Sequence, residues 1–369
     1  MAFKEIKSLT GIRGLAAIYV IIYHWNAEIF QKKQLVINHF LSVFVNHGYL
    51  SVDLFFVLSG FVLSLSSSAR FGDHVSRDDY KSFMYKRFSR IFPLYICITI
   101  LYFLLFHLGS IANLIANFTL LQGITPYLNA SIIPPGWSLT NEWITYLFFP
   151  FLFCFIWKMR RNAWVLILAS LLLLITISIV RSPVFNWMNY STLKDIHGFN
   201  PIISFTRGPA SLLRAIAAYL LGIFAYLRYK KNKERSVFLK FLILPLFVLC
   251  FFDKSDILII LLMPFLVLYI TERNILSRFL STKVIYFLGL ISYSLYVNHY
   301  LFIKTYSKIS NMAGVDNGIF SFCYVLIGTL VFSTITYYII EKPAMRFLKR
   351  NQLKFVDFSI ITSPKNKTD

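Results

Sequence analysis

Residues 47–64 have the sequence HGYLSVDLFFVLSGFVLS, an apolar run with one charged residue, Asp53. A helix needs about 20 mostly apolar residues to cross a bilayer. Asp53 has apolar neighbours on both sides, and an unpaired carboxylate in such surroundings is energetically costly. The stretch therefore predicts a membrane-spanning helix whose single acid is either protonated or paired with a cation.

The rest of the 369-residue chain has the same character: 57% of its residues are hydrophobic and 14% are charged. Soluble domains are about 25% charged, so the composition excludes a secreted, cytosolic or fibrous protein. It predicts an all-α fold, a polytopic membrane helix bundle with about 10 transmembrane helices. The expected spans lie near residues 9–27, 48–66, 92–109, 143–159, 163–180, 209–227, 238–252, 256–271, 284–303 and 318–340.

The basic residues predict the orientation of this bundle. The chain holds 37 Lys and Arg residues against 16 Asp and Glu. Most of the cations fall in alternate loops and in the C-terminal tail, whereas residues 110–142 contain none. The positive-inside rule then places both termini in the cytoplasm. The net charge of +21 is mostly a topology signal, so we expect no nucleic-acid partner. Residues 67–91 and 110–142 are expected to be an inner and an outer loop.

The cysteines and histidines give no sign of a metal centre. The four cysteines lie inside apolar runs without paired spacing, which favours buried thiols over disulfides or ligands. The seven histidines form neither HxxxH nor a partner for CxxC. We therefore expect no metal site.

The first expected span, LTGIRGLAAIYVIIYHW at residues 9–25, contains two ionisable residues, Arg13 and His24. Their spacing of eleven positions is about three helical turns, roughly 16 Å, and returns to within about 20° of one helix face. Ionisable side chains inside a membrane helix are functional candidates by default. The alternative is that Arg13 extends to the inner headgroups and His24 marks the outer interface with Trp25.

Asp53 is expected to face His24, because both lie toward the outer end of adjacent antiparallel spans. A carboxylate partner would fix the imidazole tautomer and raise its basicity, as in hydrolytic triads. A purely structural hydrogen bond between helices is the alternative for Asp53.

Three further groups of residues are candidates. Lys86, Arg87 and Arg90 form a basic cluster before the third span, either a phosphate clamp or an interface anchor. Glu142 is the one charge of the segment PPGWSLTNEWITY, whose tryptophans suit an aromatic belt. His299 lies among aromatic residues in SYSLYVNHYLF, where a buried structural histidine is the alternative.

These motifs together resemble the acyltransferase 3 family of integral-membrane acyltransferases. They occur in family order over nearly the whole chain, which makes the resemblance specific. The matching elements are the Arg-x10-His pattern (Arg13, His24), GYLSVDLFFVLSGF (Asp53), KRFSRIFPLY (Arg87, Arg90, Pro93), GWSLTNEW (Trp137, Ser138, Glu142), SYSLYVNH (His299) and IIEKP (Glu341, Pro343).

The chain departs from the family pattern at two places. Trp143 stands where a second acid often follows Glu142, which puts a carboxylate pair in doubt. Leu301 replaces a proline that commonly follows His299 by two positions, which unsettles the backbone expected there. We expect the stand-alone form of the family without an esterase-like domain, comprising a membrane domain at residues 1–346 and a basic cytoplasmic tail at residues 347–369.

The resemblance implies O-acetylation: transfer of an acyl group from acyl-CoA on the cytoplasmic side, with acetyl-CoA as co-substrate, to a glycan or lipid-linked glycan. It also implies a multi-pass protein surrounded by lipids, in a bacterial cytoplasmic membrane. The implied catalytic residues are His24, Asp53, Arg13 and Glu142. The resemblance also implies that coenzyme A is bound by Arg87, Arg90 and Lys86. It implies that the substrate is bound by Trp137, Ser138 and His299.

A transporter is the competing interpretation. Its intramembrane Arg, His and Asp residues would form a substrate or proton pathway. We find no matched pair of Gly- or Pro-broken spans in the two halves of the sequence, the usual pointer to such a protein.

Overall fold

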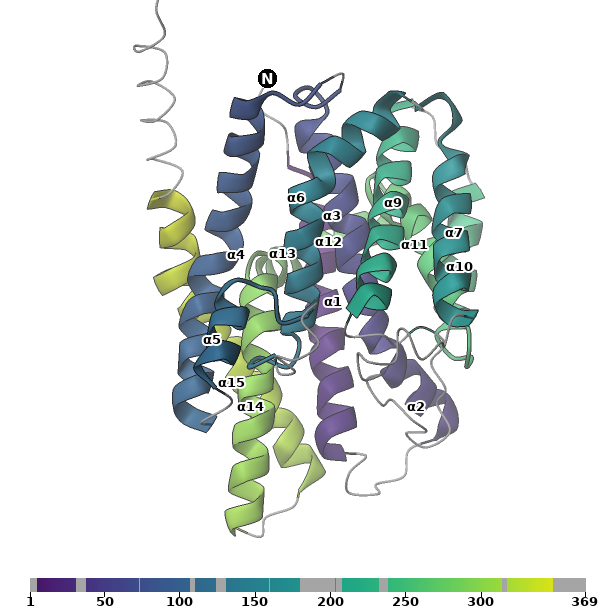
Figure 1. Cartoon of the computed structure of the whole chain (residues 1–369). Helices are drawn as coiled ribbons and strands as arrows, with labels where there is room; N and C mark the ends of the chain where they lie inside the picture. The colour runs from purple at the N-terminus through teal and green to yellow at the C-terminus, as the bar shows by residue number, and fades with distance from the viewer. Residues whose placement is uncertain are drawn as a thin grey trace, which may run out of the picture.

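The computed structural model describes residues 5–30, 38–72, 74–106, 110–123, 131–158, 160–179, 203, 208–231, 238–313 and 317–347. Within these ranges every regular element is a helix, as predicted (Figure 1). The helices are α1 (Lys7–Trp25), α2 (His39–Asn46), α3 (Ser51–Ser67), α4 (Arg77–Phe106), α5 (Ile111–Phe118), α6 (Gly136–Lys158), α7 (Trp164–Ile179), α9 (Gly208–Lys231), α10 (Phe238–Leu249), α11 (Asp256–Ile270), α12 (Ile275–Leu280), α13 (Lys283–Leu290), α14 (Ser292–Ala313) and α15 (Gly318–Thr336).

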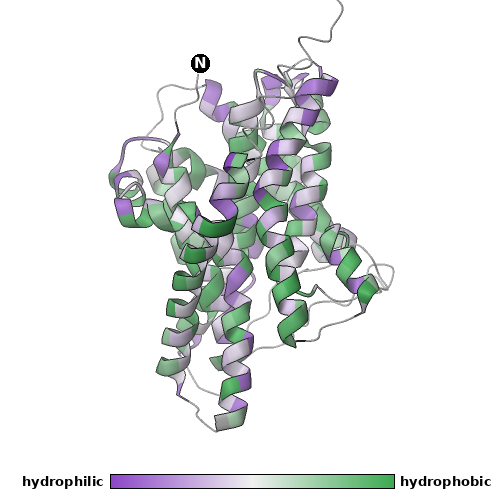
Figure 2. Cartoon of the chain, turned by 90° about the vertical axis from the view of Figure 1, so that its left-hand side faces the viewer, coloured by the Kyte–Doolittle hydropathy of each residue, from purple (hydrophilic) through white to green (hydrophobic). Residues whose placement is uncertain are grey.

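Five helical stretches among the described residues are long and apolar enough to cross a membrane. Two shorter apolar helices, α7 and α11, accompany them. Large apolar side chains such as Phe148 and Phe241 lie exposed on the outside of the bundle, and hydrophobic residues predominate along the helices (Figure 2). These features support a multi-pass membrane protein. The number of spans and the side on which each terminus lies stay predictions. The five stretches are His39–Ser67, Arg77–Phe106, Gly136–Lys158, Gly208–Lys231 and Gly318–Phe347.

The expectation of an inner loop at residues 67–91 is wrong in its second half. Helix α4 begins at Arg77, so the basic cluster lies on a helix. The Ser76 hydroxyl accepts a hydrogen bond from the Asp79 backbone N–H at 3.2 Å, which caps this helix end, and acidic residues in the first turn suit the helix dipole. Pro93 lies inside the helix.

Two other expectations also change. The expected outer loop at residues 110–142 contains α5 and the first turns of α6. The expected ninth span at residues 284–303 is divided at Ile291 between α13 and α14. Helix α14 then continues through Leu301 without a break, so the absence of a proline there leaves a regular backbone around His299.

All four cysteines are free thiols, as the spacing predicts. Two of them correct the expectation of burial: Cys97 and Cys323 are exposed. Thiols on the outside of such a bundle face an apolar environment if lipid surrounds it.

Helices α3 and α9 pack closely against each other inside the bundle. Gly60 and Gly222 lie at the point of contact, where a Cβ atom on Gly222 would approach the Val57 carbonyl oxygen to 2.2 Å. A Cβ on Gly60 would lie 2.5 Å from the Tyr219 carbonyl oxygen. Small residues thus allow close approach of the two backbones, as is common between membrane helices.

Candidate active site

A cavity of about 70 Å³ lies among α1, α3, α4, α6 and α14. Its wall contains four residues that the sequence singled out, which come from three different helices. The structure therefore brings together side chains that are far apart in the chain. These residues are Arg13, Arg90, Ser138 and Glu142.

A second, larger cavity of about 290 Å³ shares Arg13 and Arg90 with the first. Glu5 and Glu341 also line it. The two guanidinium groups thus lie at the boundary between the cavities, where their like charges repel each other. Glu142 offsets part of the Arg13 charge and Glu341 part of the Arg90 charge, and a phosphate or carboxylate bound beside both guanidinium groups would relieve the remaining repulsion.

The other two members of the basic cluster lie apart from these cavities. The Arg87 guanidinium lies 5.3 Å from the centre of the Phe83 ring and 5.6 Å from that of Tyr146. Its Nε is buried without a hydrogen-bond partner among the described residues. Lys86 is exposed. Neither lines the two cavities, so Arg13 is the basic residue that the structure places beside Arg90.

Glu142 has a hydrogen-bonded position on the cavity wall. Its Oε1 accepts a hydrogen bond from the Tyr146 hydroxyl, and the Ser59 hydroxyl lies 3.5 Å from the same oxygen. Because the Tyr146 ring also contacts Arg87, the carboxylate and the guanidinium are linked through one aromatic side chain.

Ser138 and Tyr296 form the wall of the first cavity on the side of α14. The two hydroxyl oxygens lie 2.7 Å apart, and the Pro135 carbonyl oxygen lies 3.1 Å from Ser138 Oγ and 3.2 Å from Tyr296 Oη. Since each hydroxyl has one hydrogen, one of the two donates to the other, which in turn donates to the carbonyl. The ring centres of Tyr296 and His299 are 5.9 Å apart. Tyr296 therefore connects the cavity to the histidine behind it.

His24 and His299 form a pair that the sequence did not predict. His24 Nδ1 lies 3.0 Å from His299 Nε2, and the ring centres are 4.9 Å apart. His299 is fully buried and its Nδ1 lies 2.7 Å from the Tyr296 carbonyl oxygen. His24, at the end of α1, is half-buried. Neither histidine lines the two cavities described above.

The expected pairing of Asp53 with His24 is wrong. Asp53 Oδ1 accepts a hydrogen bond from Arg214 Nε at 2.8 Å, and Oδ2 accepts a second from Nη2. Both side chains are buried. Asp53 faces α9 because α3 packs closely on that helix at Gly60 and Gly222. The missed signal was Arg214 itself, the lone charge in an apolar span, since a buried charge requires a partner.

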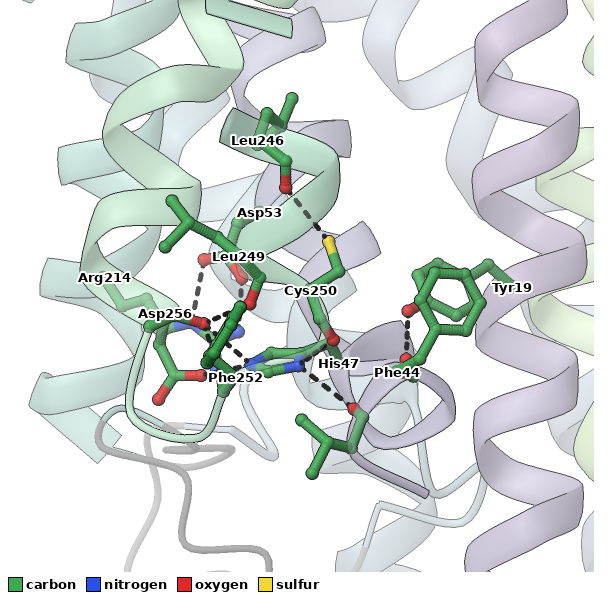
Figure 3. Close-up of polar contacts among 12 residues, drawn as sticks. Tyr19, Phe44, His47, Asp53, Arg214, Leu246, Leu249, Cys250, Phe252 and Asp256 are labelled. Carbon is green, nitrogen blue, oxygen red and sulfur yellow. Dashed lines mark hydrogen bonds and ion pairs between the residues drawn. The ribbon is translucent and has the colours of Figure 1, made fainter. Parts of the chain in front are cut away.

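A buried polar cluster surrounds this ion pair (Figure 3). The Arg214 guanidinium lies 5.1 Å from the Tyr49 ring centre and 5.9 Å from that of Trp137. His47 Nε2 lies 3.3 Å from Asp256 Oδ1. The cluster joins the segment before α3 to α9 and α11. It places Trp137 against a cation, a contact that the aromatic-belt interpretation did not predict.

Together these features define a class: a helical membrane protein with a charged interior cavity and an adjacent histidine pair. The acyltransferase domain family model matches residues 6–338, and the chain belongs to this family. No group of three or more His, Cys, Asp or Glu side chains able to hold a metal occurs among the described residues.

The relatives include proteins described as O-acetyltransferases. The chain is 24% identical to O-acetyltransferase OatA of Staphylococcus aureus (strain MRSA252), with 95% of this chain and 60% of that protein covered. It is 24% identical to the putative peptidoglycan O-acetyltransferase YrhL of Bacillus subtilis (strain 168), over 92% of this chain and 55% of YrhL. Acyltransferase MdmB of Streptomyces mycarofaciens is 31% identical over 43% of each chain. The chain thus spans only part of the length of these relatives, and no solved structure matches it.

Proposed function

We propose that the protein is a membrane O-acyltransferase that transfers an acetyl group from acetyl-CoA to a hydroxyl of a cell-surface polysaccharide or its lipid-linked precursor. The observation that carries this proposal is the interior cavity, where Arg13, Arg90, Ser138 and Glu142 meet. Family membership and the descriptions of OatA and YrhL support the reaction class.

The donor binds from the side of the larger cavity. Coenzyme A carries several phosphate charges, and Arg side chains grip phosphate oxygens through a planar fork. Arg90 and Arg13 supply that fork at the boundary of the two cavities. Arg87 supports the clamp from behind the Tyr146 ring, while the exposed Lys86 contributes only a nearby charge.

The chemistry takes place at a distance from this clamp. Arg13 and His24 are separated by roughly 16 Å along α1, so they act on different parts of an elongated donor. His24 accepts the proton of the acceptor hydroxyl as its oxygen attacks the thioester carbon. The new C–O ester bond forms, the C–S bond breaks, and His24 returns the proton to the departing thiolate. Asp53 acts indirectly, by holding α3 and α9 in place through Arg214.

The acceptor hydroxyl approaches from the other side of the bundle. Ser138 and Tyr296 line the cavity, and Tyr296 also contacts His299. Trp137 precedes Ser138 on α6, and its ring contacts Arg214. We assign acceptor positioning to Trp137 and Ser138, with Glu142 fixing the cavity wall between acceptor and donor.

Incubation of protein-containing membranes with [14C]acetyl-CoA and a bacterial cell-wall fraction tests the proposal. We expect label in the glycan fraction that mild alkali releases, as an O-acetyl ester requires. Membranes with the His24→Ala variant at equal abundance should lose this label. Uptake or release of a substrate without transfer of label would instead support the transporter alternative and refute the acyltransferase.

A further inference from the structure

The hydrogen bond between His24 and His299 determines which ring nitrogen of each histidine carries a hydrogen. His299 is the more deeply placed of the two, with none of its side chain exposed. It lies on α14 and reaches His24 on α1. The inference below rests on the proposed function, since it concerns the base of that reaction.

The direction of the hydrogen bonds follows from the Tyr296 carbonyl. A carbonyl oxygen only accepts hydrogen bonds, so His299 Nδ1, 2.7 Å away, must carry a hydrogen. A neutral imidazole has a single N–H, and burial without a carboxylate among the described contacts of His299 favours the neutral form. His299 Nε2 therefore presents a lone pair toward His24.

The same reasoning then fixes His24. Its Nδ1 lies 3.0 Å from the His299 Nε2 lone pair, so Nδ1 must be the protonated nitrogen of His24. His24 Nε2 is consequently unprotonated and able to accept a proton. The ring is also held from the sides, with its centre 4.8 Å from Tyr23 and 5.4 Å from Tyr300.

We infer that His299 is a positioning residue that holds His24 in the Nδ1–H tautomer, so that Nε2 of His24 is the general base. The bond between His299 and Tyr296 joins residues three positions apart on one helix, so the backbone of α14 sets the polarity of the whole chain of bonds. This role is distinct from the substrate binding that the sequence suggested for His299.

The proton count closes within this arrangement. His24 Nε2 takes the proton of the acceptor hydroxyl, and the imidazolium keeps its Nδ1–H bond to His299 Nε2. Nε2 then gives the proton to the coenzyme A thiolate as the C–S bond breaks. His299 begins and ends the cycle with one hydrogen, on Nδ1.

Two substitutions at one position separate this role from its alternatives. In His299→Gln the carboxamide oxygen can occupy the place of Nε2 and accept from His24, whereas His299→Leu offers no acceptor. We expect His299→Leu to lower kcat at least about 100-fold, the range of a lost general base or wrong tautomer. KM for acetyl-CoA should stay unchanged, because Arg13 and Arg90 are untouched, and His299→Gln should retain at least a tenth of the wild-type kcat.

Equal activities of His299→Leu and His299→Gln would overturn the inference. Equal, complete loss in both would make His299 itself the base. Equal retention in both, at matched membrane abundance and thermal stability, would leave the imidazole no role in positioning His24.

A spectroscopic measurement tests the inference without relying on activity. In bilayer-reconstituted protein with 15N-labelled histidine, solid-state NMR should show His24 protonated at Nδ1 and bare at Nε2, with the signal assigned by its loss in His24→Ala. In His299→Leu this single tautomer should give way to a mixture. A protonated Nε2 in the wild-type protein would refute the inference, even if acetyl transfer is confirmed. The expected spectrum without any transfer activity would leave the tautomer established and refute only the proposed function.

Discussion

At the scale of single residues, the ion pair of Asp53 and Arg214 shows what the sequence does and does not predict. The sequence predicts that a carboxylate in an apolar helix needs a cation. It does not say which cation, because Arg13, His24 and Arg214 all lie in apolar spans and helix faces are not yet assigned. The structure selects Arg214 through the close packing of α3 on α9.

Substituting one residue of the Asp53–Arg214 pair should lower the unfolding free energy far more than substituting both by apolar residues. Asp53→Leu or Arg214→Met alone leaves one buried charge without its main partner, with an expected loss of about 3–5 kcal/mol in unfolding free energy. The double variant should recover much of that loss, since apolar side chains suit this interior. Thermal unfolding of the four proteins in one detergent measures the coupling. Strictly additive losses would contradict the pairing.

Donor binding belongs to the same scale. Arg90→Ala should weaken binding of coenzyme A at least about 10-fold, because a guanidinium fork at the cavity boundary is lost. Lys86→Ala removes one charge from the same helix and is the matched control, with little expected effect because this side chain is exposed. Arg13→Lys keeps the charge but not the fork and should also weaken binding. Isothermal titration with coenzyme A measures all three, and equal affinities would make the cluster an interface anchor only.

At the scale of helices, the sequence predicted the elements better than their contacts. Apolar runs placed most of the helices within a few residues, because the bilayer imposes their length. The start of α4 at Arg77 was missed because its first turns are polar, and hydropathy does not reveal a helix that continues into water. The pairing of His24 with His299 was missed because it depends on which faces of α1 and α14 meet.

The contact of α3 with α9 makes a prediction about one glycine. Gly222→Ala places a Cβ atom 2.2 Å from the Val57 carbonyl oxygen, so the helices must separate and the pair of Asp53 with Arg214 must lengthen. We expect a lower thermal unfolding midpoint and reduced acetyl transfer. Gly328→Ala is the control, because its nearest neighbour is the Phe302 ring, at 2.5 Å, whose side chain can move. Equal midpoints for the two variants would show that the α3–α9 contact tolerates a side chain.

At the scale of the whole molecule, the two cavities distinguish the donor side of the bundle from the acceptor side. They meet at Arg13 and Arg90, and the larger one is lined by Glu5 at the start of the chain and by Glu341 near the end of the described residues. If both termini are cytoplasmic, as the basic loops predict, the larger cavity opens on the side where acetyl-CoA is available. Under the proposed function, the histidine pair then lies toward the side from which a surface glycan would arrive.

This orientation across the membrane can be tested on the intact protein. A reporter fused after residue 369 should behave as cytoplasmic, and one inserted near Asn129 as extracytoplasmic; both positions lie outside the described residues. Inverted vesicles should use added acetyl-CoA for acetyl transfer, whereas right-side-out vesicles should not, because the donor cannot cross the bilayer. The Arg90→Ala protein in inverted vesicles serves as the control for specific use of the donor. If both reporters gave the opposite location, the bundle would have the reverse orientation in the membrane. Donor use from the outside alone would then place the Arg13–Arg90 boundary on the extracytoplasmic side and remove the supply of acetyl-CoA on which the reaction depends.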